Sequence, residues 1–127
     1  MREISYSEAI REALSEEMRR DPGVYLMGED VGTFGGVWGV SAGMLDEFGE
    51  ERIRDTPISE IAIVGAGLGA AMMGMRPVID FQYGDFVLCA MDQIVQQATK
   101  LRYMSGGQIP CPIVFRGPNG AALQLSA

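Results

Sequence analysis

The segment 58–74, ISEIAIVGAGLGAAMMG, restricts the fold of this chain more than any other. Its apolar run IAIV and the motif G-x-G-x-x-A at 65–70 are similar to the strand and glycine-rich turn that open a dinucleotide-binding fold. Arg76-Pro77, however, would end the helix of that fold after about one to two turns, whereas a crossover between parallel strands needs roughly a dozen residues. Asp80 also lies too close to be the acidic residue expected about 20 positions further on. We therefore predict that the segment is itself a helix.

Both ends of this helix carry sequence signals. Ser59 or Thr56 is an N-cap candidate, Pro57 suits the first turn, and Glu60 stands where a helix N-terminus favours a carboxylate. Gly74 is the expected C-terminal stop. The helix would then have about fifteen residues, enough to cross over between two parallel strands.

The rest of the chain alternates between helical spacing of apolar residues and short apolar runs. Helices are predicted over 6–20, with Ser5 or Ser7 as the cap, and over 41–48 and 85–104. The last of these is expected to bury Val87, Met91, Ile94, Val95, Ala98 and Leu101. Strands are predicted over 24–30, 52–56, 76–81 and 111–115. This alternation indicates an α/β fold with a doubly wound parallel sheet.

Ligands of such sheets bind beyond the carboxyl ends of the strands. The loops in which we expect a site therefore follow Met27, Thr56, Phe81 and Phe115. The final residues, AALQLSA, complete no element, so we expect the chain to be the front part of a longer protein.

Charge and residue inventory exclude several functions. The net charge is -7 and the pI is near 4.5, which argues against a nucleic-acid partner. The chain has no histidine, so a zinc site built on a Cys/His cluster and a Ser-His-Asp triad are excluded. Cys89 and Cys111 are expected to be buried free thiols of a reducing compartment. No signal peptide or membrane span is recognisable, and we expect a cytoplasmic protein.

Two features of the segment 58–74 are unusual. Gly65, Gly67 and Gly69 each destabilise a helix by about 1 kcal/mol relative to alanine. Either the helix packs tightly on the sheet there, or a second helix, from another subunit, approaches closely. Glu60 stands alone among isoleucine and valine residues. It is either an exposed carboxylate that stabilises the first turn or a buried one with a raised pKa that shares a proton with a ligand nitrogen.

Several stretches together resemble one protein family. In order they are MGEDVG, FGGVWGVSAGMLDEFGEERIRDTPISE, MRPVIDFQYGDF, AMDQIVQQATKLRYMSGG and PIVFRGPNGAA. Their order and spacing resemble the β subunit of thiamine-diphosphate-dependent 2-oxoacid dehydrogenases. These are the first components of the pyruvate, branched-chain 2-oxoacid and acetoin dehydrogenase complexes.

The resemblance implies a pyrimidine-binding domain of the transketolase-like superfamily, with residues 1–127 as its N-terminal part and the C-terminal transketolase-like domain absent. It implies thiamine diphosphate as the cofactor, whose aminopyrimidine this chain receives, while an α subunit holds the diphosphate and magnesium. The implied assembly is an α2β2 heterotetramer whose small-residue helices pack across subunits. A lipoyl-bearing acyltransferase component is the implied acyl acceptor. Neither nucleic acid nor a membrane is an expected partner.

By position, Glu60 matches the glutamate that hydrogen-bonds the pyrimidine ring nitrogen. A carboxylate in an apolar pocket has a raised pKa suited to moving that proton, and the cofactor then serves as electron sink while carbon dioxide leaves. Glu29 matches a buried acid of a proton relay between two active sites. Phe86 matches the aromatic residue that packs on the aminopyrimidine, and Ile58 and Gln82 match its neighbours.

Some of these assignments have plainer alternatives. From the residues alone, Phe86 could be core, and Gln82 and Glu29 could be solvated loop residues. The backbone carbonyl at Ile113 matches a potassium site of some family members.

The chain departs from the family in ending before the histidine that follows RGPNGAA and assists acyl transfer. By itself it is therefore expected to be inactive. The resemblance favours oxidative decarboxylation of pyruvate with acyl transfer to lipoyl. A β subunit specific for acetoin or a branched-chain 2-oxoacid stays open, as does a non-catalytic module that retains the fold.

Overall fold

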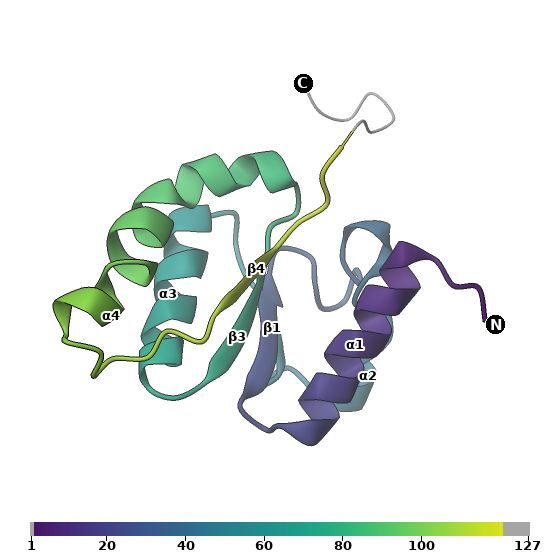
Figure 1. Ribbon diagram of the computed structural model, residues 1–127. Helices are drawn as coiled ribbons and strands as arrows, with labels where there is room; N and C mark the ends of the chain where they lie inside the picture. The colour runs from purple at the N-terminus through teal and green to yellow at the C-terminus, as the bar shows by residue number, and fades with distance from the viewer. Residues whose placement is uncertain (1, 121–127) are drawn as a thin grey trace.

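The computed structural model describes residues 2–120, in which four parallel strands form one sheet with helices on both faces (Figure 1). α1 (Tyr6–Arg20) and α2 (Met44–Phe48) pack on one face. α3 (Glu60–Met72) and the helical segment 84–104 pack on the other. This arrangement confirms the predicted α/β fold with a doubly wound parallel sheet.

The sheet has the order β2-β1-β3-β4. Its strands are β1 (Val24–Gly28), β2 (Ile53–Asp55), β3 (Arg76–Asp80) and β4 (Val114–Arg116). Gly28 pairs with Asp55 on one side and with Asp80 on the other, and Asp80 pairs with Arg116. The carboxyl ends of all four strands therefore meet at one edge of the sheet, which carries the loops expected to form a site.

Strand β1 is buried along its whole length because helices cover both of its faces. Val24 and Leu26 belong to the core under α1 and α2. The alternating residues Tyr25 and Met27 belong to the core under α3, with Ile63, Val64, Ile79, Phe81 and Ala90. The period of two along the strand thus assigns each side chain to one helical layer.

The N-terminal helix α1 has the predicted bounds, and Ser5 is its cap. The Glu8 N–H donates to Ser5 Oγ, and the Ser5 N–H donates to the Glu8 carboxylate at 2.7 Å. The helix predicted from Ser41, in contrast, begins only at Met44. Ser41 is buried, and its hydroxyl donates to the Val31 carbonyl oxygen at 2.7 Å, so it supports the preceding loop instead of the helix.

Helix α3 confirms that the segment 58–74 is helical, and it begins before its glycines. The dinucleotide-binding alternative is therefore wrong. Gly74, with a φ of 95°, follows the helix as its predicted stop. Ser59 occupies the N-cap position without capping, because its hydroxyl donates to the Pro57 carbonyl oxygen at 3.1 Å. Thr56 and Pro57 both lie before the helix.

The three glycines of α3 have different surroundings. A Cβ at Gly67 would lie 2.5 Å from Cδ1 of Ile79, so this glycine lets the helix approach β3. A Cβ at Gly65 would meet only the Gln93 side chain, at 3.6 Å, and one at Gly69 would meet nothing within 4 Å. Packing on the sheet therefore explains Gly67, and a partner helix over the exposed side remains a prediction.

The helix predicted over 85–104 is not one regular helix. It consists of a 3-10 segment (Gly84–Ala90), a π segment (Gln93–Ala98) and α4 (Leu101–Met104). Val87 and Ile94 pack against the α3 core as predicted, but Met91 and Val95 are exposed. Apolar spacing predicted that Val87 and Ile94 face inward, but it did not predict the change of helix type along the segment.

Strand β4 begins later than predicted, at Val114 rather than Cys111. Pro112 has no backbone N–H to donate, so pairing with β3 begins only beyond it. Both cysteines are free, but Cys89 is exposed, beside the exposed Leu88, and Cys111 is half-buried. The expectation that both thiols are buried is therefore wrong.

Candidate functional site

Strands β1 and β3 are neighbours whose following connections run in opposite directions, to β2 on one side and to β4 on the other. Open parallel sheets bind ligands at such a reversal. Glu29 and Asp30 follow β1 there, and Phe81 and Gln82 follow β3. Two of the residues predicted for the site, Glu29 and Gln82, thus leave the sheet at its reversal point.

Gly28 allows the two strands to approach each other at this edge. A Cβ at position 28 would overlap the backbone carbonyl oxygen of Asp80 and lie 3.0 Å from the Asp80 Cβ. The Asp80 side chain is buried and forms an ion pair with Arg116. Burial raises the pKa of Asp80 to about 6, although the Arg116 charge and hydrogen bond lower it. This pair joins β3 to β4 on the α1 side of the sheet, where Val78 also lies.

Glu29 is buried, with only 7% of its surface exposed. Burial raises the pKa of its carboxyl group, and the nearby charges of Glu60 and Asp30 raise it further, while a hydrogen bond from the Ser59 backbone lowers it. The alternative of a solvated loop residue is therefore wrong for Glu29. The fold brings the two predicted acids, Glu29 and Glu60, together.

Glu60 is the first residue of α3. It is half-buried, so its exposure is intermediate between the exposed and the buried carboxylate that the sequence leaves open. The unpaired N–H groups of a helix N-terminus stabilise a carboxylate at this position. Ile58, two residues earlier, is 81% exposed and leaves an apolar surface beside it.

Thr56 lies beside the end of β1, because its N–H donates to the Gly28 carbonyl oxygen at 3.0 Å. Its Oγ1 is buried and has no hydrogen-bond partner among the described residues. A buried polar atom without a partner costs about 1–3 kcal/mol, so a bound group that supplies one would be favoured. The sequence suggested Thr56 as a helix cap and as the residue before one of the loops in which we expected a site, but not as a ligand-binding residue.

Gln82 is half-buried, and its Nε2 donates to Asp30 Oδ2 at 2.7 Å. Asp30 has a φ of 56°, an uncommon value for a residue other than glycine. Sequence reasoning did not identify Asp30, although it directly follows Glu29 at the carboxyl edge.

Phe86 lies in the 3-10 segment just beyond β3 and is 39% exposed, so it is not simply a core residue. Its ring meets that of Tyr83 edge to face, with centroids 5.7 Å apart. Tyr83 therefore supports one edge of the ring.

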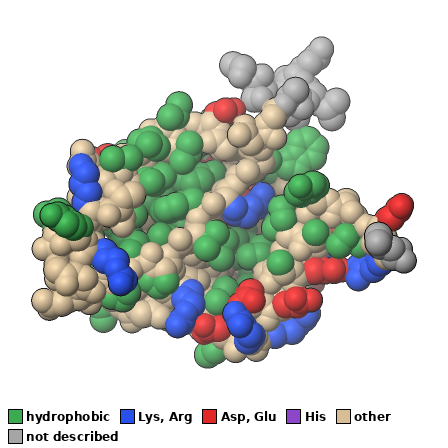
Figure 2. All heavy atoms as spheres, in the orientation of Figure 1, with side chains coloured by type: hydrophobic (Ala, Val, Ile, Leu, Met, Phe, Trp, Pro, Cys, Tyr) green, Lys and Arg blue, Asp and Glu red, His purple; other side chains and the backbone are tan. Residues whose placement is uncertain are grey.

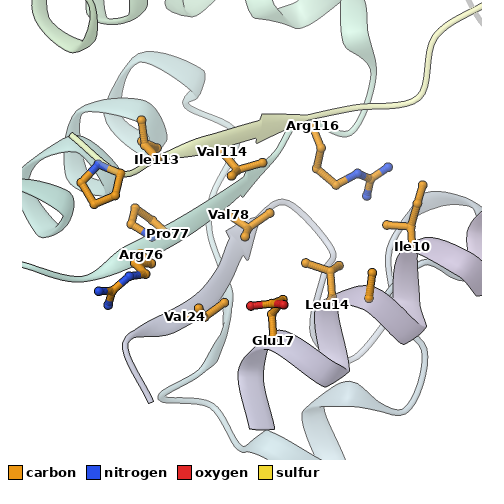
Figure 3. A pocket seen from close by; sticks show the side chains of 12 residues that line it. Ile10, Leu14, Glu17, Val24, Arg76, Pro77, Val78, Ile113, Val114 and Arg116 are labelled. Atoms are coloured by element: carbon orange, nitrogen blue, oxygen red, sulfur yellow. The ribbon is translucent and has the colours of Figure 1, made fainter. Parts of the chain in front are cut away.

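Ile113 lies apart from these residues. Its side chain packs against the α3 core, and it also lines an apolar groove of about 510 Å³ between α1 and the strands β3 and β4. Leu14, Val78 and Val114 face this groove (Figure 3). The groove contains none of the carboxyl groups predicted for the site, so it is a separate feature.

The side chains at this edge of the sheet have chemistry that suits one end of thiamine diphosphate, the cofactor that the family resemblance implies. An aminopyrimidine is flat and carries ring nitrogens and an amino group, which match the carboxyl groups of Glu29 and Glu60, the unpartnered Thr56 hydroxyl and the partly exposed Phe86 ring. A diphosphate does not fit, because the negative charges of Glu29, Asp30 and Glu60 would repel it.

Within residues 2–120, no helix is long and apolar enough to cross a bilayer. The same residues contain no group of three or more Cys, Asp or Glu side chains arranged to hold a metal ion.

Comparison with known proteins identifies the family of this chain. The family model of the transketolase pyrimidine-binding domain matches residues 2–127. The pyruvate dehydrogenase E1 component subunit beta of Rickettsia bellii is 50% identical over 98% of this chain and 38% of its own length. The 2-oxoisovalerate dehydrogenase subunit beta of Bacillus subtilis is 50% identical over 94% of this chain and 37% of its own length. The chain thus spans somewhat more than a third of the length of these relatives.

Proposed function

The chain belongs to the family of transketolase pyrimidine-binding domains, and on that premise we propose that it binds the aminopyrimidine of thiamine diphosphate in a 2-oxoacid dehydrogenase. The observation that carries this proposal is the burial of Glu29 at the reversal point of the sheet, near enough to Glu60 for that charge to raise the pKa of Glu29. The cofactor, when bound, supplies the carbon nucleophile and the electron sink for decarboxylation.

In this proposal Glu60 holds a proton at the pyrimidine ring nitrogen. The position suits proton exchange, because Glu60 is half-buried and therefore partly shielded from water. Glu29, whose pKa burial raises, stores or passes on a proton beside it. Phe86 and Ile58 provide apolar surface that excludes water from the ring, and Gln82 contacts its edge.

A partner subunit is part of the same proposal, because the acidic cluster cannot also hold the diphosphate. An α subunit would hold the diphosphate with magnesium in a heterotetramer, and a lipoyl-bearing acyltransferase would accept the acyl group. Exposed apolar side chains favour such a partner. They include Leu88, Ile61 and Met73. Figure 2 shows hydrophobic side chains gathered over the layer formed by α3 and the segment 84–104. The potassium ion at the Ile113 carbonyl and the cytoplasmic location also stay predictions.

Pyruvate is the proposed substrate. A branched-chain 2-oxoacid is the second candidate, because relatives named for either substrate share 50% identity with this chain. An acetoin dehydrogenase β subunit and a non-catalytic module have no specific observation in their favour.

The proposal can be tested on the full-length chain co-expressed with its α subunit. Thiamine diphosphate with magnesium is titrated by calorimetry into the wild-type complex and into Glu60→Gln. Exchange of the thiazolium C2 proton with deuterium is then followed by NMR. We expect the cofactor to bind both complexes and the exchange rate to fall by at least about a hundredfold in the variant, the usual contribution of a general acid or base.

Glu50→Gln is the matched control, because Glu50 is an exposed glutamate in the turn before β2. It should bind and exchange as the wild type does. Unchanged exchange in Glu60→Gln would reduce Glu60 to a residue that starts a helix and would remove the catalytic assignment.

A further inference from the structure

We propose that Asn119 is a site of spontaneous deamidation, at which the backbone nitrogen of Gly120 attacks the asparagine side chain. Asn119 is the only asparagine in the sequence of 127 residues, and a glycine follows it directly. Asparagine is one of the chemically labile residues of proteins. The modification is independent of the proposed function, because it needs only the chain itself and water.

The fold places the two reacting groups side by side. The Gly120 N–H donates to Oδ1 of Asn119 at 2.9 Å, so the nitrogen lies beside the carbonyl group that it would attack. Both residues are exposed, and water can therefore reach them. Gly120 has no Cβ that would keep the two groups apart, and its φ of 110° is one that other residues rarely adopt. The pair is thus held near the arrangement that ring closure requires.

The reaction balances without an oxidant or a reductant. The Gly120 nitrogen gives its proton to water and bonds to Cγ of Asn119, while the bond between Cγ and Nδ2 breaks. Nδ2 takes up a proton and leaves as ammonia. Water then adds to one of the two carbonyl carbons of the succinimide ring that has formed. Opening at one carbon gives aspartate, and opening at the other gives isoaspartate, in which the β-carbon has joined the main chain.

The backbone directly before this site is anchored. The Gly84 N–H donates to the Pro118 carbonyl oxygen at 2.8 Å, which ties the loop after β4 to the segment after β3. An isoaspartate would lengthen the main chain immediately beyond Pro118. Either product would also add a negative charge to a groove of about 580 Å³ that Asn119 and Arg116 line. Deamidation would therefore change both the path and the charge of the loop after β4.

The test follows deamidation in the full-length chain, assembled with its α subunit, during incubation at neutral pH in isotope-labelled water. Hydrolysis of the ring places a labelled oxygen in the new carboxyl group, and peptide mass spectrometry locates it at position 119. The same protein is incubated in urea, where the unfolded backbone moves freely. We expect the folded chain to take up label at least as fast as the unfolded chain, because the fold already brings the nitrogen beside the carbonyl group.

Two variants and an internal control accompany the measurement. Asn119→Gln would have to close a larger ring and should stay unlabelled over the same interval. Gly120→Ala places a methyl group next to the attacking nitrogen and should slow the uptake of label by about tenfold or more. The exposed Gln108 of the wild type serves as the internal control and should also stay unlabelled.

Each result decides the proposal. Labelling of Asn119 in the folded complex at or above the rate in urea supports it. A lower rate in the folded complex would show that the fold protects the site, and the proposal would be wrong. Equal rates in Gly120→Ala and the wild type would show that the nitrogen of residue 120 is not the attacking group, which also overturns it. Binding of thiamine diphosphate plays no part, so a failure of the proposed function leaves this result unchanged.

Discussion

The carboxyl groups of Glu29 and Glu60, from the end of β1 and the start of α3, lie close enough for the charge on Glu60 to raise the pKa of Glu29. Burial of Glu29 is the larger cause, and the two effects act in the same direction. A buried acid beside a second acid can hold a proton at a pH at which an exposed glutamate has lost it.

Removing the Glu60 charge should lower the pKa of Glu29. In Glu60→Gln the Coulombic contribution disappears while burial remains, so the pKa should move back part of the way towards an ordinary glutamate. Titration of the Glu29 side-chain carboxyl carbon by NMR measures this shift. Asp30→Asn should produce a smaller shift in the same direction, because the effect of Asp30 is weaker. A larger shift in Asp30→Asn than in Glu60→Gln would contradict the arrangement.

Asp80 should make stability depend on pH. Its folded pKa of about 6 lies above the value of 3.8 for an exposed aspartate, so the folded protein keeps a proton that the unfolded chain releases. The contribution of Asp80 to folding is therefore most favourable below pH 4 and is lost as pH rises to 6, by roughly 3 kcal/mol. The free energy of unfolding is measured with urea for the wild type and for Asp80→Asn at several pH values. The difference between the two proteins isolates the contribution of Asp80. A difference that stays constant between pH 4 and 7 would show that Asp80 titrates normally.

Two glycines of α3 should respond oppositely to alanine. Gly67→Ala forces a Cβ against Ile79 and should lower the free energy of unfolding by about 1–3 kcal/mol. Gly69→Ala meets nothing within 4 Å and should raise it by about 0.5–1 kcal/mol through helix propensity. Thermal and urea unfolding of the two variants provide the comparison. Equal destabilisation by both would mean that the exposed side of α3 is also covered.

Gly28→Ala should disrupt the site edge of the sheet. Its Cβ would overlap the Asp80 backbone, which cannot move aside as a side chain can. We expect a loss of about 3 kcal/mol or more in unfolding free energy. Gly49→Ala is a useful comparison, because no atom would contact its Cβ and any cost comes from its φ of 76° alone. Hydrogen exchange of the β1 and β3 amides would locate the damage, which should spread from the carboxyl ends of these strands.

Much of the fold could be predicted because its signals are local. The Ser5–Glu8 capping box sets the start of α1, and Arg76-Pro77 together with Gly74 sets the end of α3. Prediction was less accurate where contacts with neighbouring elements determine the local structure. Ser41 supports a loop through Val31 instead of starting a helix, and the segment 84–104 changes its turn width as it packs against α3.

Local sequence signals were enough to predict the alternation of helices and strands, the edge of the sheet where a site would form, and the family whose motifs Glu29, Glu60, Gln82 and Phe86 match. The folded chain was needed to show that Glu29 is buried near Glu60, that Asp30 holds Gln82, and that Gly67 rather than Gly69 faces the sheet. Helix caps and apolar periods act over a few neighbouring residues. Burial and pairing, in contrast, depend on strand register, which brings together residues far apart in the chain.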